Sequence, residues 1–253
     1  QQYAMKIDPN GWCVVKEGVD LHTLCDYSTY NIDSESADYS ANRISYENES
    51  MVFYVDSKEY NGRKFTLGIP GIHNVLNALS CIVLLEKIGV SYPDIRNALA
   101  SFKGVRRRFD THINTDDLLF IDDYAHHPEE LKLLIDSIKM MFPQKKVIAI
   151  FQPHLYSRTK DFGAGFGEQL SRFDELYLLP IYGAREKEII GISSEWLLSK
   201  VDLKNKSVVE PTKVLEIMKG TTEGVVLTIG AGDIDRLVSP LHKILLENIS
   251  HTI

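Results

Sequence analysis

Apolar and polar residues alternate with two different periods along this chain of 253 residues. The first part contains short alternating runs that predict strands, over 11–16, 41–46, 51–55 and 64–67. From about residue 74 the apolar spacing becomes helical and predicts helices over 74–88 and 92–102. Gly89 is placed to end the first helix, and Pro93 lies in the first turn of the second.

After Gly104 the pattern becomes a regular alternation of strands and helices. It predicts strands over 118–122, 146–151, 174–179, 206–209 and 224–229. Helices are expected near 128–141, 160–172, 193–201, 212–219 and 232–247. Such alternation is typical of a parallel, doubly wound α/β sheet. We therefore expect two α/β domains, over 1–105 and 106–253, the first with an antiparallel strand-rich part.

Composition narrows the class of protein. A net charge of −7 argues against a nucleic-acid partner, because such affinity depends on neutralising phosphates. No apolar stretch approaches the roughly 18–20 residues that cross a bilayer, so no membrane insertion is expected. The three cysteines lack metal-ligand spacing, and no basic-then-apolar leader opens the sequence. A cytoplasmic location is the resulting expectation.

Two polar segments follow predicted strands, at 122–128 and 151–158. Ligands of open α/β sheets bind at the carboxyl ends of the strands, so both segments are candidates for a ligand site. His154 and Arg158 are four residues apart and suit a carboxylate ligand, although both also fit an ordinary exposed strand–helix junction.

The first of these segments has two further interpretations. Asp122, Asp123, His126 and His127 are residue types that bind metals, and such loops occur in metal-dependent phosphoesterases. Alternatively, Pro128 and the two glutamates after it form a well-made helix start.

Two candidates for nucleotide contacts lie earlier in the chain. Asn74 and Asn77 are spaced to project from one helix face, and an amide matches the donor–acceptor edge of adenine. The alternative is a helix cap at His73 or Asn74. The arginines at 106–108 suit phosphate groups, or they form a solvated basic turn.

Glycine-rich stretches give weaker signals. Gly230-Ala231-Gly232 resembles half of a dinucleotide fingerprint, but a tight turn with Asp233 near a helix start is favoured. The glycines within 163–167 fall in a helical pattern and predict close packing. No G-x-x-x-x-G-K-[ST] phosphate loop occurs in the sequence.

Five segments in this order resemble the Mur ligases of peptidoglycan synthesis: 73–77, 104–109, 122–128, 151–159 and 181–186. The resemblance is greatest to the branch that joins L-alanine to UDP-N-acetylmuramate. It implies that 1–105 is part of a central ATP-binding domain without its phosphate loop, and that 106–253 is a Rossmann-like domain for the amino acid. It also implies ATP-dependent ligation through an acyl phosphate, with Mg²⁺ held mostly by residues outside this sequence. A monomer or weak homodimer is expected, and this chain alone is expected to be inactive.

The resemblance assigns roles to particular residues. The residues implied for ATP are Asn74, Asn77, Arg108 and Asp123, and those implied for the amino acid are Tyr124, His126, His154 and Arg158. Arg108 and His154 are the implied catalytic residues, and no metal ligand is assigned. Leu155 departs from relatives that carry a second arginine there, which places more of the carboxylate binding on Arg158. A related ligase that attaches a tripeptide to the same sugar is the alternative, but Tyr124 and the run 152–154 favour free L-alanine.

Overall fold

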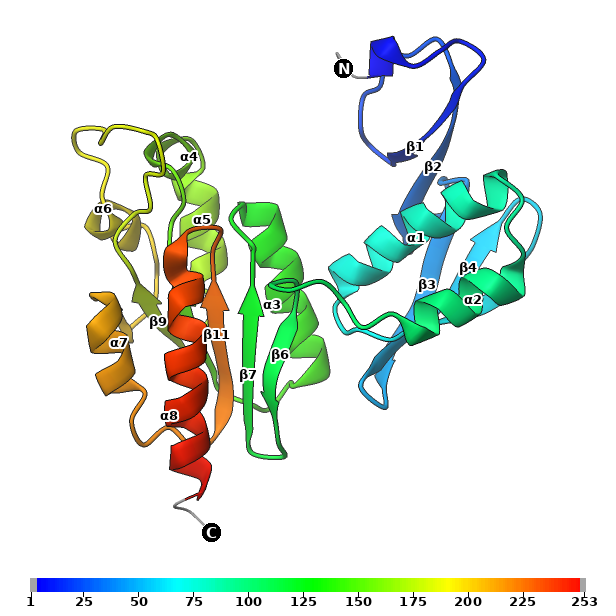
Figure 1. The fold of residues 1–253 in the computed structure, drawn as a ribbon. Helices are drawn as coiled ribbons and strands as arrows, with labels where there is room; N and C mark the ends of the chain where they lie inside the picture. The colour runs from blue at the N-terminus through cyan, green and yellow to red at the C-terminus, as the bar shows by residue number, and fades with distance from the viewer. Residues whose placement is uncertain (1–3, 251–253) are drawn as a thin grey trace. The chain divides into compact units, whose positions relative to one another are not determined.

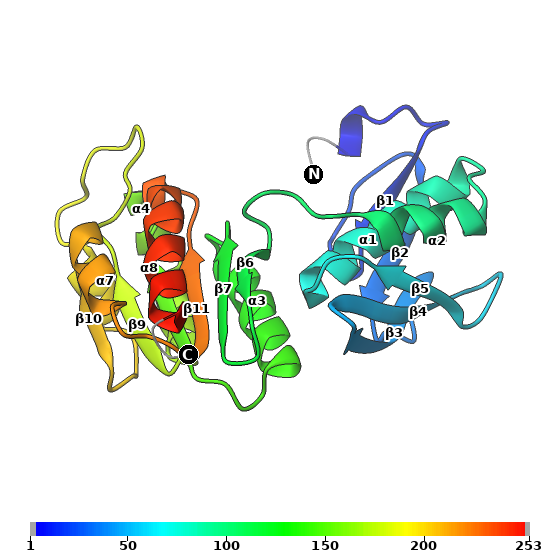
Figure 2. The ribbon, with the colours of Figure 1, turned by 60° about the horizontal axis from the view of Figure 1, so that its bottom comes forward.

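The computed structural model describes residues 4–250, and the chain divides into two compact units, Gln1–Lys103 and Gly104–Ile253 (Figures 1 and 2). Each unit has its own β-sheet and its own buried apolar core. The two are described in turn.

The sheet of the first unit combines parallel and antiparallel pairing. Its strands lie in the order β1 (Trp12–Lys16), β2 (Asp26–Ile32), β3 (Tyr39–Glu47), β4 (Ser50–Ser57) and β5 (Arg63–Leu67). The first three pair in parallel and the last three antiparallel, which confirms the predicted antiparallel part. Strand β2 was not predicted, because polar residues fill most of its positions and it leaves little apolar alternation.

A short 3-10 turn, η1 (Ala4–Lys6), precedes β1. Two helices, α1 (Ile72–Lys87) and α2 (Tyr92–Ser101), follow β5. Helix α1 lies against β1–β4, and α2 lies against β5. The residue before α1 is Gly71, with φ of 108°, and no side chain caps the helix. The predicted cap at His73 or Asn74 is therefore wrong, because the helix already begins at Ile72.

The sheet of the second unit has the order β10-β9-β8-β11-β7-β6. All pairs are parallel except β6 with β7. The strands are β6 (Asp110–Asn114), β7 (Leu118–Asp123), β8 (Val147–Phe151), β9 (Glu175–Leu178), β10 (Lys206–Val208) and β11 (Gly224–Ile229). The five predicted strands are confirmed, whereas β6, with its polar sequence Asp-Thr-His-Ile-Asn, was not predicted.

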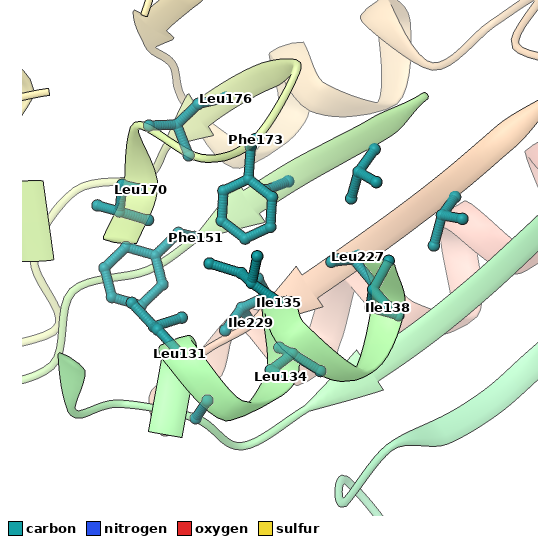
Figure 3. Packing of buried hydrophobic residues seen from close by; sticks show 14 of the residues in the cluster. Leu131, Leu134, Ile135, Ile138, Phe151, Leu170, Phe173, Leu176, Leu227 and Ile229 are labelled. Carbon is teal, nitrogen blue, oxygen red and sulfur yellow. The ribbon is translucent and has the colours of Figure 1, made fainter. Parts of the chain in front are cut away.

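Helices cover both faces of this sheet, as a doubly wound fold requires. Alternate residues of β7 enter separate apolar clusters, one with α3 and the other with α8. Figure 3 shows the first cluster, in which α3 residues Leu131, Leu134, Ile135 and Ile138 pack towards the strands. The helices of that face are α3 (Pro128–Met141), α5 (Gly163–Leu170) and α6 (Ser194–Leu198), and those of the other face are α7 (Pro211–Ile217) and α8 (Val238–Ser250).

Two predicted helices are interrupted. The expected helix over 160–172 is two helices, α4 (Tyr156–Asp161) and α5, separated at Phe162. The expected helix over 232–247 begins as a 3-10 turn, η2 (Asp233–Leu237), before α8. The predicted close packing of the glycines is confirmed, because a Cβ at Gly163 would lie 2.5 Å from the Trp196 ring.

Candidate functional site

Three loops meet at the carboxyl edge of the second unit's sheet, after β7, β11 and β8. The loop after β11 is a tight turn, as predicted, and Gln152 at the end of β8 holds it. The Gln152 side chain donates to Asp233 (Nε2 to Oδ1, 2.8 Å) and accepts from the Ile234 amide (3.0 Å). A Cβ on Gly232 would clash with Gln152 Oε1 and would lie 2.7 Å from Tyr182 Cβ, so a larger residue there would displace both side chains. Gln152 therefore shapes the backbone of the site.

The Arg107 side chain, which is mostly buried, bonds to both the end of β7 and the loop after β11. Its Nε lies 3.1 Å from Asp122 Oδ2, and its Nη atoms donate to the Gly230 and Gly232 carbonyls. Asp122 is buried and also accepts from Thr228 Oγ1 (2.7 Å). Burial raises the pKa of Asp122 despite these partners. The three consecutive arginines look equivalent in sequence, but Arg107 holds the loops together from inside the protein. Nothing in the repeated arginines distinguishes it from its neighbours.

Asp123 holds the chain on either side of it. Its Oδ2 accepts from the Phe109 amide (2.7 Å), and its Oδ1 accepts from the Ala125 amide (2.8 Å). The residue is 3% exposed, and desolvation raises the pKa of Asp123 to about 6. Both carboxylate oxygens thus already serve the fold. Because a carboxylate has about four acceptor positions, a ribose contact remains a proposal for this residue.

Four rings form a continuous row at this edge: Tyr124, His126, His154 and Tyr182. The successive distances between ring centres are 5.3, 6.1 and 5.8 Å. Strands β7 and β8 flank β11, so their ends are about 10 Å apart, and the loops must lean together to bring His126 and His154 into contact. Tyr182 was not predicted as a site residue, although the motif that contains it contributed to the resemblance.

Arg158 lies beside His154, towards the Tyr182 end of the row. Its Nη1 is 3.2 Å from His154 Nδ1, and within the described residues no carboxylate lies within 4.0 Å of its guanidinium group. Burial, and then the positive charge of Arg158, lower the pKa of His154. Glu186 accepts from both the amide and the hydroxyl of Ser157 (3.0 and 2.5 Å), which fixes the start of α4. The structure therefore brings His154 and Arg158 together as predicted from their spacing.

Arg108 lies at the opposite end. Its guanidinium carbon is 5.2 Å from the Tyr124 ring centre, and its Nη1 is 3.8 Å from Glu130 Oε1. The side chain is 42% exposed, so most of its donors can reach a ligand. Arg106 is exposed, and the three arginines therefore have three different environments.

The two asparagines belong to α1 of the first unit and are not equivalent. Asn74 is buried, and its Nδ2 donates to the Pro70 carbonyl oxygen (2.7 Å). Asn77 is exposed. Their proposed contact with adenine is independent of the row of rings.

The side chains that suggested a metal centre are separately engaged. Asp122 pairs with Arg107, Asp123 binds backbone amides, and His127 Nδ1 accepts from the Glu129 amide at the start of α3. Over residues 4–250, no three His, Cys, Asp or Glu side chains lie close enough together to hold a metal ion. The metal-centre interpretation of the 122–128 segment is therefore not supported by the side chains of the described residues. In the same described range, no helix is both long and apolar enough to cross a membrane.

The second unit is thus a Rossmann-like domain with a cationic, ring-lined site at the carboxyl edge of its sheet. Residues 107–232 match the family described as Mur ligase, glutamate ligase domain. The chain is 41% identical over 246 residues to a UDP-N-acetylmuramate–L-alanine ligase of Christiangramia forsetii, a match that covers 97% of this chain and 53% of the relative. The chain belongs to the Mur ligase family, and it spans about half the length of the curated relatives it matches.

Solved structures agree on the fold. The UDP-N-acetylmuramate–alanine ligase MurC of Thermotoga maritima aligns with a TM-score of 0.67 at 28% identity, over 89% of this chain and 48% of that one. The MurF ligase of Thermotoga maritima, solved in complex with ADP, aligns with a TM-score of 0.64 at 19% identity. That alignment covers 91% of this chain and 50% of MurF.

Proposed function

We propose that this chain is part of an ATP-dependent ligase that joins L-alanine to UDP-N-acetylmuramate through an acyl phosphate. The observation that carries the proposal is Arg158, a guanidinium group beside His154 that forms no ion pair within 4.0 Å in the described residues; the nearby Glu186 carboxylate bonds to Ser157 instead. A planar guanidinium pairs with a carboxylate through two parallel hydrogen bonds, so Arg158 suits the carboxylate of an amino acid. The name of the 41%-identical relative supports L-alanine as that amino acid.

The row of rings supports the same assignment. His154 lies beside Arg158, and His126 and Tyr124 follow it along the row, so polar ring atoms line the edge next to an amino acid bound at Arg158. Arg108 at the Tyr124 end is the proposed contact for phosphate oxygens, and Asp123 is the proposed contact for the ribose. Separately, Asn74 and Asn77 of the first unit are the proposed contacts for adenine. Positioning and charge stabilisation supply most of the catalysis in phosphoryl transfer, and Arg108 fits that role. A cytoplasmic reaction is part of the proposal.

The test measures phosphate release from ATP by the polypeptide extended upstream of Gln1 with the segment that precedes the matched region in the relatives. UDP-N-acetylmuramate is supplied with L-alanine, with the tripeptide, or with neither. Release that requires L-alanine supports the proposal, and release that requires the tripeptide assigns the chain to the related ligase. Phosphate release in the sample that contains neither L-alanine nor the tripeptide contradicts both assignments. Because the sequence has no phosphate loop, we expect the 253 residues alone to show no ligation.

A further inference from the structure

The two histidines in the middle of the row contact partners of opposite hydrogen-bonding character through the same ring atom. His126 Nδ1 lies 2.9 Å from the Tyr124 carbonyl oxygen and 3.2 Å from Glu130 Oε2. A carbonyl and an ionised carboxylate only accept, so this Nδ1 carries a proton. His154 Nδ1 lies 3.2 Å from Arg158 Nη1, and a guanidinium group only donates. His154 Nδ1 therefore carries no proton.

The neutral rings are consequently opposite tautomers. In His126 the Nε2 atom keeps its lone pair, and the hydrogen bonds of the described residues leave that atom without a partner. In His154 the Nε2 atom carries the proton and can only donate. Two adjacent imidazoles thus present one acceptor and one donor to whatever binds beside them.

We propose that His126 is the base that accepts a proton from the amino group of the incoming amino acid, and that Glu130 is the positioning residue that holds its ring. This inference rests on the proposed ligase function. Glu130 contacts His126 twice, since its Oε2 also accepts from the His126 amide (2.8 Å). The arrangement of carboxylate, imidazole and substrate proton is the one that orients a general base.

The charges around the two rings favour His126, rather than His154, as the base. His126 faces the carboxylate of Glu130 from α3, the Tyr124 ring on its own loop, and His154 from the loop after β8. An imidazolium at His126 would therefore be stabilised by an adjacent negative charge. An imidazolium at His154 would instead face the guanidinium of Arg158 in a partly buried like-charge contact, and the Glu186 carboxylate offsets only part of that repulsion. Arg108 Nη1 lies 3.8 Å from the other carboxylate oxygen of Glu130, Oε1.

The chemical step requires only these groups, an acyl phosphate and solvent. The bound amino acid enters as an ammonium ion and transfers one proton to His126 Nε2. The freed nitrogen lone pair attacks the acyl-phosphate carbonyl carbon and forms the C–N bond. The C–O bond to phosphate breaks, phosphate leaves with that electron pair, and the second ammonium proton is lost to solvent. The Nε2–H of His154 is available to donate to an oxygen of the reacting group.

Nuclear magnetic resonance of this chain tests the tautomers directly. Long-range ¹H–¹⁵N spectra of histidine-labelled protein are recorded at a pH where both rings are neutral, and His126→Gln and His154→Gln each identify one set of signals. We expect a protonated Nδ1 with a bare Nε2 at His126, and the reverse at His154. The opposite tautomer at either residue overturns the inference, whatever the enzyme's activity.

Kinetics of the extended polypeptide test the catalytic role. We expect His126→Gln to lower kcat for L-alanine about 100-fold, as loss of a general base does, with a much smaller change in KM. The matched control is His127→Gln, because His127 caps α3 and contacts the Phe162 ring, and its kcat should stay at the wild-type value. Equal losses in the two variants, or an unchanged kcat in His126→Gln, contradict the proposal.

Glu130→Gln separates positioning from general structure. The variant keeps an acceptor for Nδ1–H but loses the negative charge, so the ring holds its proton less tightly. We expect kcat to fall about tenfold and the acid limb of its pH profile to move to lower pH. An unmoved limb would assign Glu130 a structural role only. If the wild type releases phosphate with no amine donor, the proposed function fails as well; an active wild type with unaffected variants overturns this inference alone.

Discussion

The loops after β7 and β8 are both rich in polar residues, but their polar side chains have different hydrogen-bond partners. In the loop after β7, Asp122, Asp123 and His127 all bond to the protein itself: to Arg107, to backbone amides and to the start of α3. In the loop after β8, the Arg158 side chain has a single hydrogen bond, to His154, and forms no ion pair within 4.0 Å in the described residues. A polar cluster at a sheet edge therefore contains two kinds of residue: those that hold the loops of the site in place, here called the frame, and those that are available to contact a ligand. Burial and hydrogen bonding distinguish the two kinds.

The frame residues also explain unusual backbone conformations at the site. Arg107, Phe109, Leu155 and Ala184 all have positive φ without being glycine, at 61°, 52°, 69° and 51°. Such conformations are unfavourable and persist only where surrounding bonds fix them. Here the bonds of Arg107 and the amide contact of Asp123 fix the first two. The internal polar bonds of the β7 loop thus maintain the shape in which the ring row is held.

The largest effect should follow from Arg107→Ala. This change leaves the buried Asp122 carboxylate without its cation, which costs about 3–5 kcal/mol of unfolding free energy. Urea unfolding followed by Trp196 fluorescence in a Trp12→Phe background reports on the second unit alone. The exposed neighbour provides the control, because Arg106→Ala should change stability by less than about 0.5 kcal/mol. Similar losses in both would show that Arg107 does not brace the site.

Arg158→Ala should show the reverse pattern. Stability should remain within about 0.5 kcal/mol of the wild type, while KM for L-alanine rises about 100-fold through loss of a charge-assisted hydrogen bond. Assays of the extended polypeptide over a range of L-alanine concentrations measure the change. Lys160→Ala, an exposed cation on the same helix, is the control and should leave KM unchanged. An unchanged KM in Arg158→Ala would remove the central support for amino-acid binding here.

Asp123→Asn should change how the free energy of unfolding depends on pH. The folded-state pKa of about 6 lies above the ordinary value near 4, so the folded protein binds this proton more tightly than the unfolded chain. The stability contributed by Asp123 is then present below about pH 4 and lost as the pH rises through about 6. The difference between wild type and variant should change by about 2–3 kcal/mol across this window, in the direction of a less stable wild type at high pH. A difference that does not vary with pH would mean that Asp123 titrates normally.

The smallest effect is expected for His127→Ala. Loss of a helix cap costs about 1 kcal/mol, because the Glu129 amide at the start of α3 loses its acceptor. The same urea titration measures it, and kcat should not change. A large loss of activity would move His127 from the frame to the ligand contacts.

The pattern of the chain predicted most of the second unit. Strands that are buried on both faces contain continuous apolar runs, Leu118–Ile121 in β7 and Val225–Leu227 in β11. Helix α3 begins and ends as its proline and apolar spacing indicate. Strands β2 and β6 were missed because polar residues occupy most of their positions, and their pairing depends on neighbours that are distant in sequence. The break at Phe162 was missed for a related reason, since the helical spacing of apolar residues continues across it.

For the site, the amino-acid sequence alone predicts which residue types stand at the ends of β7 and β8, and hence the kind of ligand to expect. Strand order, which places β11 between those two strands, was decided only in three dimensions. The same is true of the bracing role of Arg107, the capture of the β11 turn by Gln152, and the opposite tautomers of His126 and His154. Each depends on a partner far away in sequence or on the orientation of a ring. Local propensity and periodicity carry no information about either, because they describe each segment alone.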